Sequence, residues 1–373
     1  MYQLAVYIAV AFCLSAVCGV ITIPLIINFC NKKKLYDEPN IRKIHKNSIP
    51  RLGGISFLPS MLLALLAATA FYNSSLVDKQ LQFKLWSVYF FISLLLIYSV
   101  GIIDDLIGIG AKTKFAFQIV AAILLPLSGL YINNLYGFLG IYEIPYVLGA
   151  PLTVLIMVFI VNAINLIDGI DGLSASIAFI ALTGFLYIFM QFNIMPYSML
   201  IASMMGVLVP FFYFNIWGNP QKHHKIFMGD SGSLTLGFIL SFLTVKVMMK
   251  NPNVVQFSDT AVILAYSLLI VPSFDVLRVS LVRLMHKRPI FQADKNHIHH
   301  KLLRAGLSQG KALTTIIALS LTFIAVNIIL SHYTSLNVIV LTDCIIWLLF
   351  HHATNRLITK RGKEVFTITT EEK

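Results

Sequence analysis

The chain has 373 residues, of which 58% are apolar and only 12% are charged, and its formal net charge is +12. A soluble globular domain carries about twice that share of charged residues, so the composition excludes one. The basic excess favours contact with membrane lipids or an anionic substrate, and we expect no nucleic-acid partner.

Apolar runs long enough to cross a bilayer recur along the whole chain. A hydrocarbon core of roughly 30 Å takes about 17–25 helical residues. We predict an all-α polytopic membrane protein: one multi-helix domain over residues 1–355 and a tail over residues 356–373. The first run lacks a basic start and a cleavage site, so we expect a retained helix and not a signal peptide. About eleven transmembrane helices are predicted, near 4–28, 52–72, 85–103, 115–132, 146–164, 173–192, 196–214, 232–249, 261–282, 312–331 and 335–352.

Basic residues gather on one side of the predicted membrane. Of the 28 Lys and Arg residues, 24 lie in the odd-numbered loops, at a helix end beside them, or in the tail. The positive-inside rule then places those loops and the C-terminus in the cytoplasm, and the N-terminus outside. The dense polar clusters lie on the same loops, so we predict an active site on the cytoplasmic face.

The first predicted loop is basic and contains turn signals. Arg42, Lys43, His45 and Arg51 precede or flank the Gly53-Gly54 pair. These side chains can bind phosphate. A basic loop that only flanks the membrane is the alternative, and composition alone favours it.

Two adjacent carboxylates, Asp104 and Asp105, end the third apolar run. Neighbouring negative charges repel, and the pKa of one should rise unless a cation intervenes. Either one of them acts as a base, or both face a metal ion. Lys112 and Lys114 follow on the same side.

Residues 162–172 read Asn-Ala-Ile-Asn-Leu-Ile-Asp-Gly-Ile-Asp-Gly and separate two apolar runs. Asn165 and Asp168 are three residues apart, as are Asp168 and Asp171, which places these groups on one face of a helical turn. Clustered oxygen ligands without a balancing Lys or Arg suggest a hard cation such as Mg²⁺. An ordinary acidic loop with turn glycines is the plainer alternative.

The seventh predicted loop contains Asn215 and Phe227 and leads to Asp230 at the start of the eighth run. Backbone N–H groups at a helix start suit an anion, or an ion that bridges to one. Asp230 and Ser231 are equally well explained as plain helix caps.

Three imidazoles lie within four residues of the ninth predicted loop: His297, His299 and His300. They suit a zinc site, an anion clamp or a solvated cluster. No further zinc ligand is evident, and the nearby Arg288 favours phosphate. Elsewhere, Asp275 is expected to pair with Arg278, while Lys246 and Asp343 are expected to extend to the opposite membrane surface.

Five motifs in this order resemble those of the polyprenyl-phosphate N-acetylhexosamine-1-phosphate transferases, between Asp37 and Leu303. Ile298 separates His297 from His299, as in the N-acetylglucosamine branch and unlike the muramoyl-pentapeptide branch. No third carboxylate follows Asp105 closely, so none is carried over from the family. The motifs are residues 42–45 with 50–54, Asp104-Asp105, residues 162–172, residues 228–233 and residues 297–300.

The resemblance implies transfer of a sugar 1-phosphate, most simply N-acetylglucosamine 1-phosphate, from a UDP-sugar to undecaprenyl phosphate. UMP would leave, and the lipid-linked diphosphosugar would start cell-envelope polysaccharide synthesis at a bacterial inner membrane. The implied cofactor is Mg²⁺, with Mn²⁺ as a substitute. The implied partners are the two substrates and membrane lipids, and the sequence leaves a homodimer open.

The resemblance also implies roles for individual residues. Phe227 would stack on uracil, a flat base that suits an aromatic ring. The implied catalytic residues are Asp104, Asp105, Asp168 and Asp171. The implied metal ligands are Asp230, Asn165 and Asp168. The implied substrate contacts are Phe227, Asn215, Arg51, His45, His297, His299, His300 and Arg288.

Two other classes fit parts of the sequence. Residues 229–232 match the Gly-x-Ser-Gly pattern of an intramembrane serine protease with Ser231 as the nucleophile, but that leaves the carboxylate-rich face unexplained. A transporter would place charge at the bilayer midplane between repeats, and the sequence shows neither feature clearly.

Overall fold

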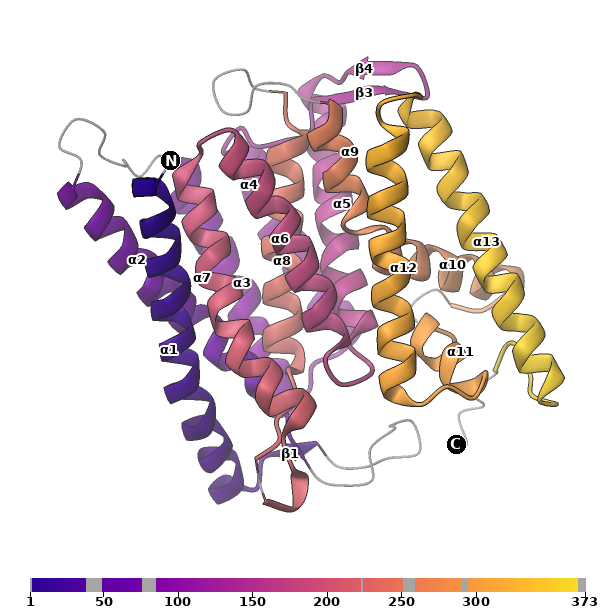
Figure 1. The fold of residues 1–373 in the computed structure, drawn as a ribbon, viewed down its shortest axis with the longest axis horizontal. Helices are drawn as coiled ribbons and strands as arrows, with labels where there is room; N and C mark the ends of the chain where they lie inside the picture. Colours follow the sequence, from indigo (N-terminus) through magenta and orange to yellow (C-terminus); the bar gives the residue numbers. More distant parts are fainter. Residues whose placement is uncertain are drawn as a thin grey trace.

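The computed structural model describes residues 2–37, 49–75, 85–222, 224–250, 259–289 and 294–367. It is mostly helical, and most of the helices run between the two ends of the molecule (Figure 1). The helices are α1 (Tyr2–Lys33), η1 (Gly53–Ser56), α2 (Phe57–Ser75), α3 (Leu85–Ile107), α4 (Ala111–Leu127), α5 (Tyr146–Ile167), α6 (Leu173–Gln191), α7 (Met195–Phe212), η2 (Tyr213–Trp217), η3 (Pro220–Lys222), α8 (Gly229–Met248), α9 (Asp259–Ser267), α10 (Ile270–Met285), α11 (Ile298–Arg304), α12 (Gln309–Leu330) and α13 (Leu336–Lys360).

All eleven apolar runs coincide with helices. Nine helices in the described part are long and apolar enough to cross a membrane, and α9 with α10, bent by 56°, adds a tenth if the two form one span. The remaining run, near residues 115–132, corresponds to α4, which has 17 residues. The chain is therefore a multi-pass, predominantly helical membrane protein. The count of eleven spans, the orientation of the termini and the boundary after residue 355 remain predictions.

Two small antiparallel hairpins lie at opposite ends of the helix bundle. The strands β1 (Tyr36–Asp37) and β2 (Ile49–Pro50) pair at one end, and β3 (Asn134–Phe138) and β4 (Ile141–Glu143) pair at the other (Figure 1). Backbone polar groups within a bilayer must be satisfied internally. Strands this short are therefore found where the chain has left the helical layer.

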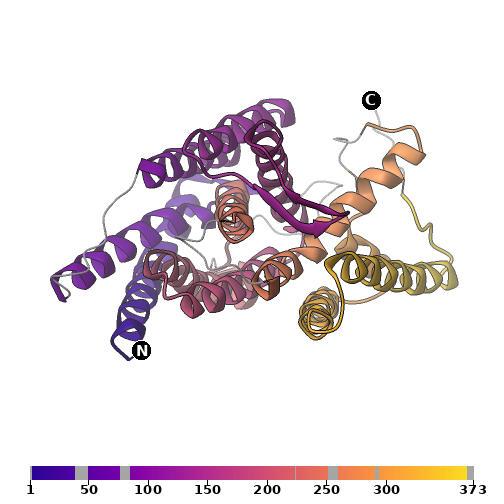
Figure 2. The same ribbon diagram turned by 90° about the horizontal axis from the view of Figure 1, so that it is seen from above.

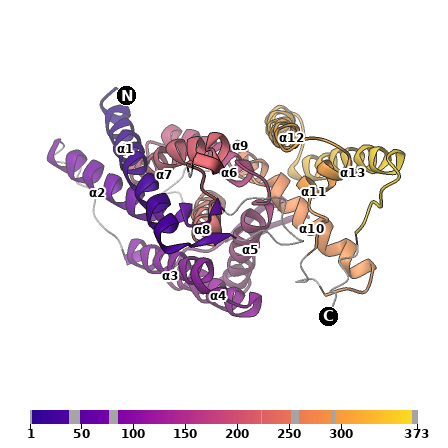
Figure 3. The same ribbon diagram turned by 90° about the horizontal axis from the view of Figure 1, so that it is seen from below.

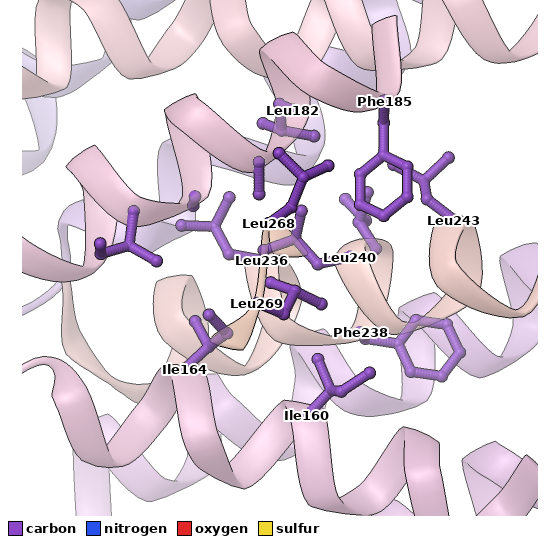
Figure 4. Packing of buried hydrophobic residues seen from close by; sticks show 14 of the residues in the cluster. Ile160, Ile164, Leu182, Phe185, Leu236, Phe238, Leu240, Leu243, Leu268 and Leu269 are labelled. Atoms are coloured by element: carbon purple, nitrogen blue, oxygen red, sulfur yellow. The ribbon is translucent and has the colours of Figure 1, made fainter. Parts of the chain in front are cut away.

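Helix α8 forms the centre of the bundle. Viewed from below, it is enclosed by α3, α5, α6 and α7 (Figure 3). Every residue from Ser231 to Val247 is buried. Leu236, Leu240 and Leu243 pack among side chains that include Ile164 and Phe185 of the neighbouring helices (Figure 4). Because its sides are enclosed, α8 exposes polar groups mainly at its N-terminal end.

Small residues let backbones approach the start of α8. A Cβ on Gly54 would overlap the backbone of Gly232, and one on Gly101 would overlap that of Ser231. Close backbone approach at small residues is typical of helix packing in membranes. The ends of η1 and α3 are thereby held directly against the N-terminus of α8.

The C-terminal helices α12 and α13 lie to one side of this bundle (Figure 2). Two charged residues in the membrane part do not extend to the surface as expected. Lys246 is 2% exposed and lies 4.6 Å above the Trp86 ring. Asp343 is fully buried and accepts a hydrogen bond from Asn327 at 3.0 Å. Aromatic and amide partners thus take the place of solvent at both positions.

Candidate active site

Asp105 fixes the start of α8. Its two carboxylate oxygens accept the backbone N–H groups of Asp230 at 2.8 Å and of Ser231 at 2.9 Å. Gly229 has a positive φ of 73°, and a Cβ there would collide with Asp105 and with the Arg51 carbonyl. A carboxylate from α3 therefore caps α8, where unpaired N–H groups and the helix dipole favour negative charge.

Lys114, at the start of α4, joins Asp104 and Asp230. Its ammonium group lies 2.8 Å from an Asp104 oxygen and also forms a short ion pair with Asp230. The other Asp104 oxygen accepts the Ile109 N–H at 2.7 Å. The pairing of Lys114 with Asp230 was not predicted, because the two residues lie 116 positions apart on different loops.

Asn165, near the end of α5, is the second partner of Asp230. Its amide nitrogen donates to Asp230 at 2.9 Å and to the Ser233 hydroxyl at 2.8 Å. Asp104, Asn165 and Asp230 therefore meet at one end of the bundle, although they are up to 126 positions apart in sequence. The predicted convergence of these three residues is present in the fold.

Asp168 follows directly after α5 beside this cluster. Burial, together with the charges of Asp230, Asp171 and Asp105, raises the pKa of Asp168 to about 8. Asp171 differs from it because Lys225 lies 2.7 Å away and forms an ion pair. The two carboxylates of this loop therefore have different environments: Asp171 is paired with a cation, whereas Asp168 faces other carboxylates.

The histidine segment abuts the same loop. A Cβ on Gly169 would overlap the His299 ring, so only glycine fits there. His297 Nδ1 lies 2.8 Å from Asp275, which also forms the expected pair with Arg278 at 2.7 Å. This pairing of Asp275 with Arg278 confirms the expectation, whereas the contact with His297 was not foreseen.

Burial determines the charge state of the two other histidines. It lowers the pKa of His299 well below its ordinary value. Burial and the nearby positive charges of His297, Lys295 and Arg304 lower the pKa of His300 to about 4. Both imidazoles are therefore neutral near pH 7 and can donate a hydrogen bond to an anion without adding charge.

The loop before α8 is tied to its surroundings by backbone and amide contacts. Buried Asn215 accepts the Gly172 N–H at 2.7 Å and donates to the Ile226 carbonyl at 2.8 Å. The Phe227 N–H donates to the Pro50 carbonyl at 2.7 Å, while its ring is half-buried three residues before Asp230. Asn215, predicted as a substrate contact, has its polar groups engaged within the protein.

The structure links three predicted substrate contacts less directly to the carboxylate cluster. Arg51 is half-buried, and its carbonyl lies against Gly229. Arg288 follows α10, where its N–H donates to the Arg283 carbonyl at 2.9 Å. His45 lies outside the residues that the structure describes.

The donor atoms at the carboxylate cluster suit a hard cation. Asp104, Asp168, Asp230 and the Asn165 carbonyl offer oxygen only, which is the preference of Mg²⁺. As arranged, the described residues contain no group of three His, Cys, Asp or Glu side chains close enough to hold a metal ion. Lys114 supplies positive charge between two of these carboxylates. The chemistry of the ligand set therefore fits Mg²⁺, and no coordination geometry is implied.

Ser231, the nucleophile in the protease alternative, is fully buried. Its backbone N–H contacts Asp105, and the titratable group beside it is that carboxylate and not a histidine. A serine nucleophile requires a base within hydrogen-bond reach. The geometry thus disfavours the protease reading.

Comparisons with known proteins identify the family of the chain. Residues 87–248, which include Asp104, Asn165 and Asp230, match the model of glycosyl transferase family 4. A probable undecaprenyl-phosphate N-acetylglucosaminyl 1-phosphate transferase of Bacillus subtilis (strain 168) is 31% identical over 357 residues, 91% of this chain and 87% of the relative.

Two further relatives carry the name undecaprenyl-phosphate alpha-N-acetylglucosaminyl 1-phosphate transferase. The Yersinia pestis protein is 28% identical, covering 78% of this chain and 76% of the relative. The Salmonella typhi protein is 27% identical, covering 80% of this chain and 78% of the relative. With the carboxylates, the capped helix α8 and the histidine segment in one place, these similarities show that the chain belongs to the polyprenyl-phosphate N-acetylhexosamine-1-phosphate transferases of glycosyl transferase family 4 and is a phosphotransferase.

Proposed function

We propose that the protein transfers N-acetylglucosamine 1-phosphate from UDP-N-acetylglucosamine to undecaprenyl phosphate and releases UMP. The reaction would take place at the cytoplasmic face of a bacterial inner membrane and start cell-envelope polysaccharide synthesis. One observation carries the proposal: Asp104, Lys114, Asn165 and Asp230 converge at the exposed end of a buried helix. Carboxylates and a cation at one point suit transfer of a phosphoryl group.

An apolar groove supports the lipid acceptor. It lies between α4 and α5, has a volume of about 580 Å³ and is lined by Phe115, Ile119, Val154 and Val158, among others. Phe115 is the residue next to Lys114 on α4. We infer that the polyprenyl chain occupies this groove, which would bring the lipid phosphate to the Lys114 ammonium.

In the proposed step, an oxygen of the lipid phosphate attacks the sugar-bearing phosphorus of the UDP-sugar. One P–O bond forms, and the bond to UMP breaks, so UMP leaves with the bridging oxygen and its electron pair. A phosphate monoester is largely ionised at neutral pH, with a second pKa of about 6, so the nucleophile does not depend on a strong base. Lys114 orients it, and Asp105 holds the start of α8 in place.

Asp104, Asp168, Asp230 and Asn165 are the residues that would hold Mg²⁺ or Mn²⁺. A bound divalent ion supplies neutralisation of diphosphate charge. His299 and His300, neutral at pH 7, would donate hydrogen bonds to the UDP-sugar. Asp275 orients His297. Phe227 would stack on the uracil ring.

The direct test incubates the purified protein with undecaprenyl phosphate, Mg²⁺ and a panel of UDP-sugars, and measures UMP together with the lipid product. Release of UMP only with UDP-N-acetylglucosamine is the expected result. Activity with UDP-muramoyl-pentapeptide or another N-acetylhexosamine donor would change the donor assignment. Absence of UMP release with every donor would overturn the proposal.

The metal assignment has its own test in Asp230→Asn, with Glu143→Gln as a matched control on the exposed strand β4. Asparagine nearly keeps the shape but removes the charge. Turnover should fall by on the order of a hundredfold, about 2.7 kcal/mol, with a changed Mg²⁺ dependence. Near-normal turnover of Asp230→Asn at low Mg²⁺ would remove Asp230 from the metal site.

A further inference from the structure

A second polar pocket lies away from the carboxylate cluster, between α10, α11 and α13. It has a volume of about 490 Å³, and its walls include Arg278, Lys301, His351 and Asn355. Leu348 and Phe366 supply part of its apolar wall, so the pocket combines basic and apolar side chains. The catalytic proposal uses none of these contacts.

The pocket is separate from the candidate active site, although both touch the short helix α11. His299 faces the Gly169 loop. Lys301, two residues further, contacts α13 instead, and its ammonium donates to the side-chain amide oxygen (Oδ1) of Asn355 at 2.6 Å. Residues two positions apart point to nearly opposite sides of a helix, about 200° around the axis. Helix α11 thus serves the active site on one face and the pocket on the other.

The pocket holds a buried lysine that has no carboxylate partner among the described residues. Lys301 is 3% exposed, and within the described residues its hydrogen-bond partners, Asn355 and His351, carry no negative charge. Burial, with the charges of Arg278 and Arg304, lowers the pKa of Lys301 to about 7. Asp275, the carboxylate whose charge acts on Lys301, is already engaged by Arg278, His297 and the Ile298 N–H.

Two buried donors in the pocket lack acceptors. His351 is 5% exposed, and its Nδ1 faces the Lys301 ammonium at 3.3 Å, so Nδ1 accepts and Nε2 carries the hydrogen. Neither that Nε2 nor Arg278 Nε has a hydrogen-bond partner in the described part of the chain. A buried donor without an acceptor is costly. Donors and charge together favour an anion as the missing partner.

We propose that this pocket binds the phosphate group of an anionic phospholipid. Lys301, His351 and Arg278 supply the charge-assisted hydrogen bonds that a phosphate oxygen accepts. Leu348 and Leu349 are 67% and 64% exposed on the outer side of α13, and acyl chains pack along them. Basic pockets between membrane helices are a known setting for anionic head groups.

The test uses the purified full-length protein in detergent. Three additives are compared: phosphatidylglycerol, phosphatidylcholine with the same acyl chains, and inorganic phosphate. For each, we measure the midpoint of thermal unfolding, and native mass spectrometry counts the lipids that stay bound. Phosphatidylglycerol should raise the midpoint most. If phosphatidylcholine raises it equally, the anion site is wrong. If inorganic phosphate alone matches phosphatidylglycerol, the lipid assignment is wrong.

Variants locate the effect in the pocket. Lys301→Met should weaken phosphatidylglycerol binding roughly tenfold, and Lys301→Arg should retain it. Lys360→Met, an exposed lysine at the end of α13, is the matched control and should bind normally. Equal binding by Lys301→Met and the wild-type protein would refute the proposal.

A second variant keeps the test decisive if Lys301→Met does not fold. Asn355→Asp places a carboxylate against the Lys301 ammonium, in the position now held by a neutral amide. This variant should be more stable than the wild-type protein without lipid and should lose the response to phosphatidylglycerol. A full phosphatidylglycerol response in Asn355→Asp would contradict the site.

Discussion

Lys114 is the residue on which the carboxylate cluster depends, because it is the ammonium between Asp104 and Asp230. Lys114→Met removes this charge and should cut turnover roughly 100-fold, as loss of one preorganised charge-stabilising group does elsewhere. Lys112→Met, on the exposed side of the same helix, is the matched control. UMP-release rates compare the two, with folded yield checked for each. Equal rates would mean that Lys114 only balances charge.

Phe227 provides a second test at the same scale. Phe227→Ala should weaken UDP-sugar binding by roughly 1–3 kcal/mol through lost base stacking, while affinity for the lipid phosphate stays unchanged. Trp217→Ala, an exposed aromatic residue in the same loop, controls for loop disturbance. Titration of UDP-sugar binding measures the effect, and unchanged affinity would remove Phe227 from the nucleotide site.

Single residues were predictable where the chemistry is local to the sequence. Asp104 and Asp230 could be singled out because charged groups at a membrane boundary are costly and usually functional. The partner of Asp230 could not, since Lys114 is 116 positions away and only the packing of α4 against α3 brings it there. The contact of His297 with Asp275 was missed for the same reason, at a separation of 22 positions.

At the level of elements, the position of α8 depends on glycine contacts. Gly54→Ala would push a methyl group into the backbone of Gly232. Both backbones must then shift, so we expect destabilisation of about 1–3 kcal/mol, as for overpacked cores, together with reduced turnover. Gly310→Ala, where a Cβ meets nothing within 4 Å, should change stability by less than about 0.5 kcal/mol. Thermal unfolding in detergent measures both variants.

The positions of the helices could be predicted from the sequence better than the bends and hairpins that interrupt them. Each apolar run of spanning length became helical because a bilayer leaves the backbone few alternatives. The 56° bend between α9 and α10 was not foreseen, because the run from Ala261 to Val282 is long and apolar enough to be taken as one straight span. The hairpin of β3 and β4 was also missed, although Gly137 and Gly140 are turn signals in the sequence and form its turn.

For the whole molecule, the orientation in the membrane decides whether the carboxylate cluster can meet a cytoplasmic UDP-sugar. The basis for the prediction is that 24 of the 28 basic residues lie in loops, helix ends or the tail that the sequence assigns to the side of that cluster. Positively charged loops are retained in the cytoplasm. Lys311→Cys at the start of α12 and Tyr142→Cys in β4 are both at exposed positions, at opposite ends of the bundle.

In a background without the four native cysteines, a membrane-impermeant thiol reagent added to intact cells should label Tyr142→Cys and not Lys311→Cys. After the membrane is opened, both should react, which shows that the second cysteine is accessible. UMP-release activity of the cysteine-free parent confirms that the fold is intact. Labelling of Lys311→Cys in intact cells would place the carboxylates outside, away from nucleotide sugars, and the proposed reaction would then lack its donor.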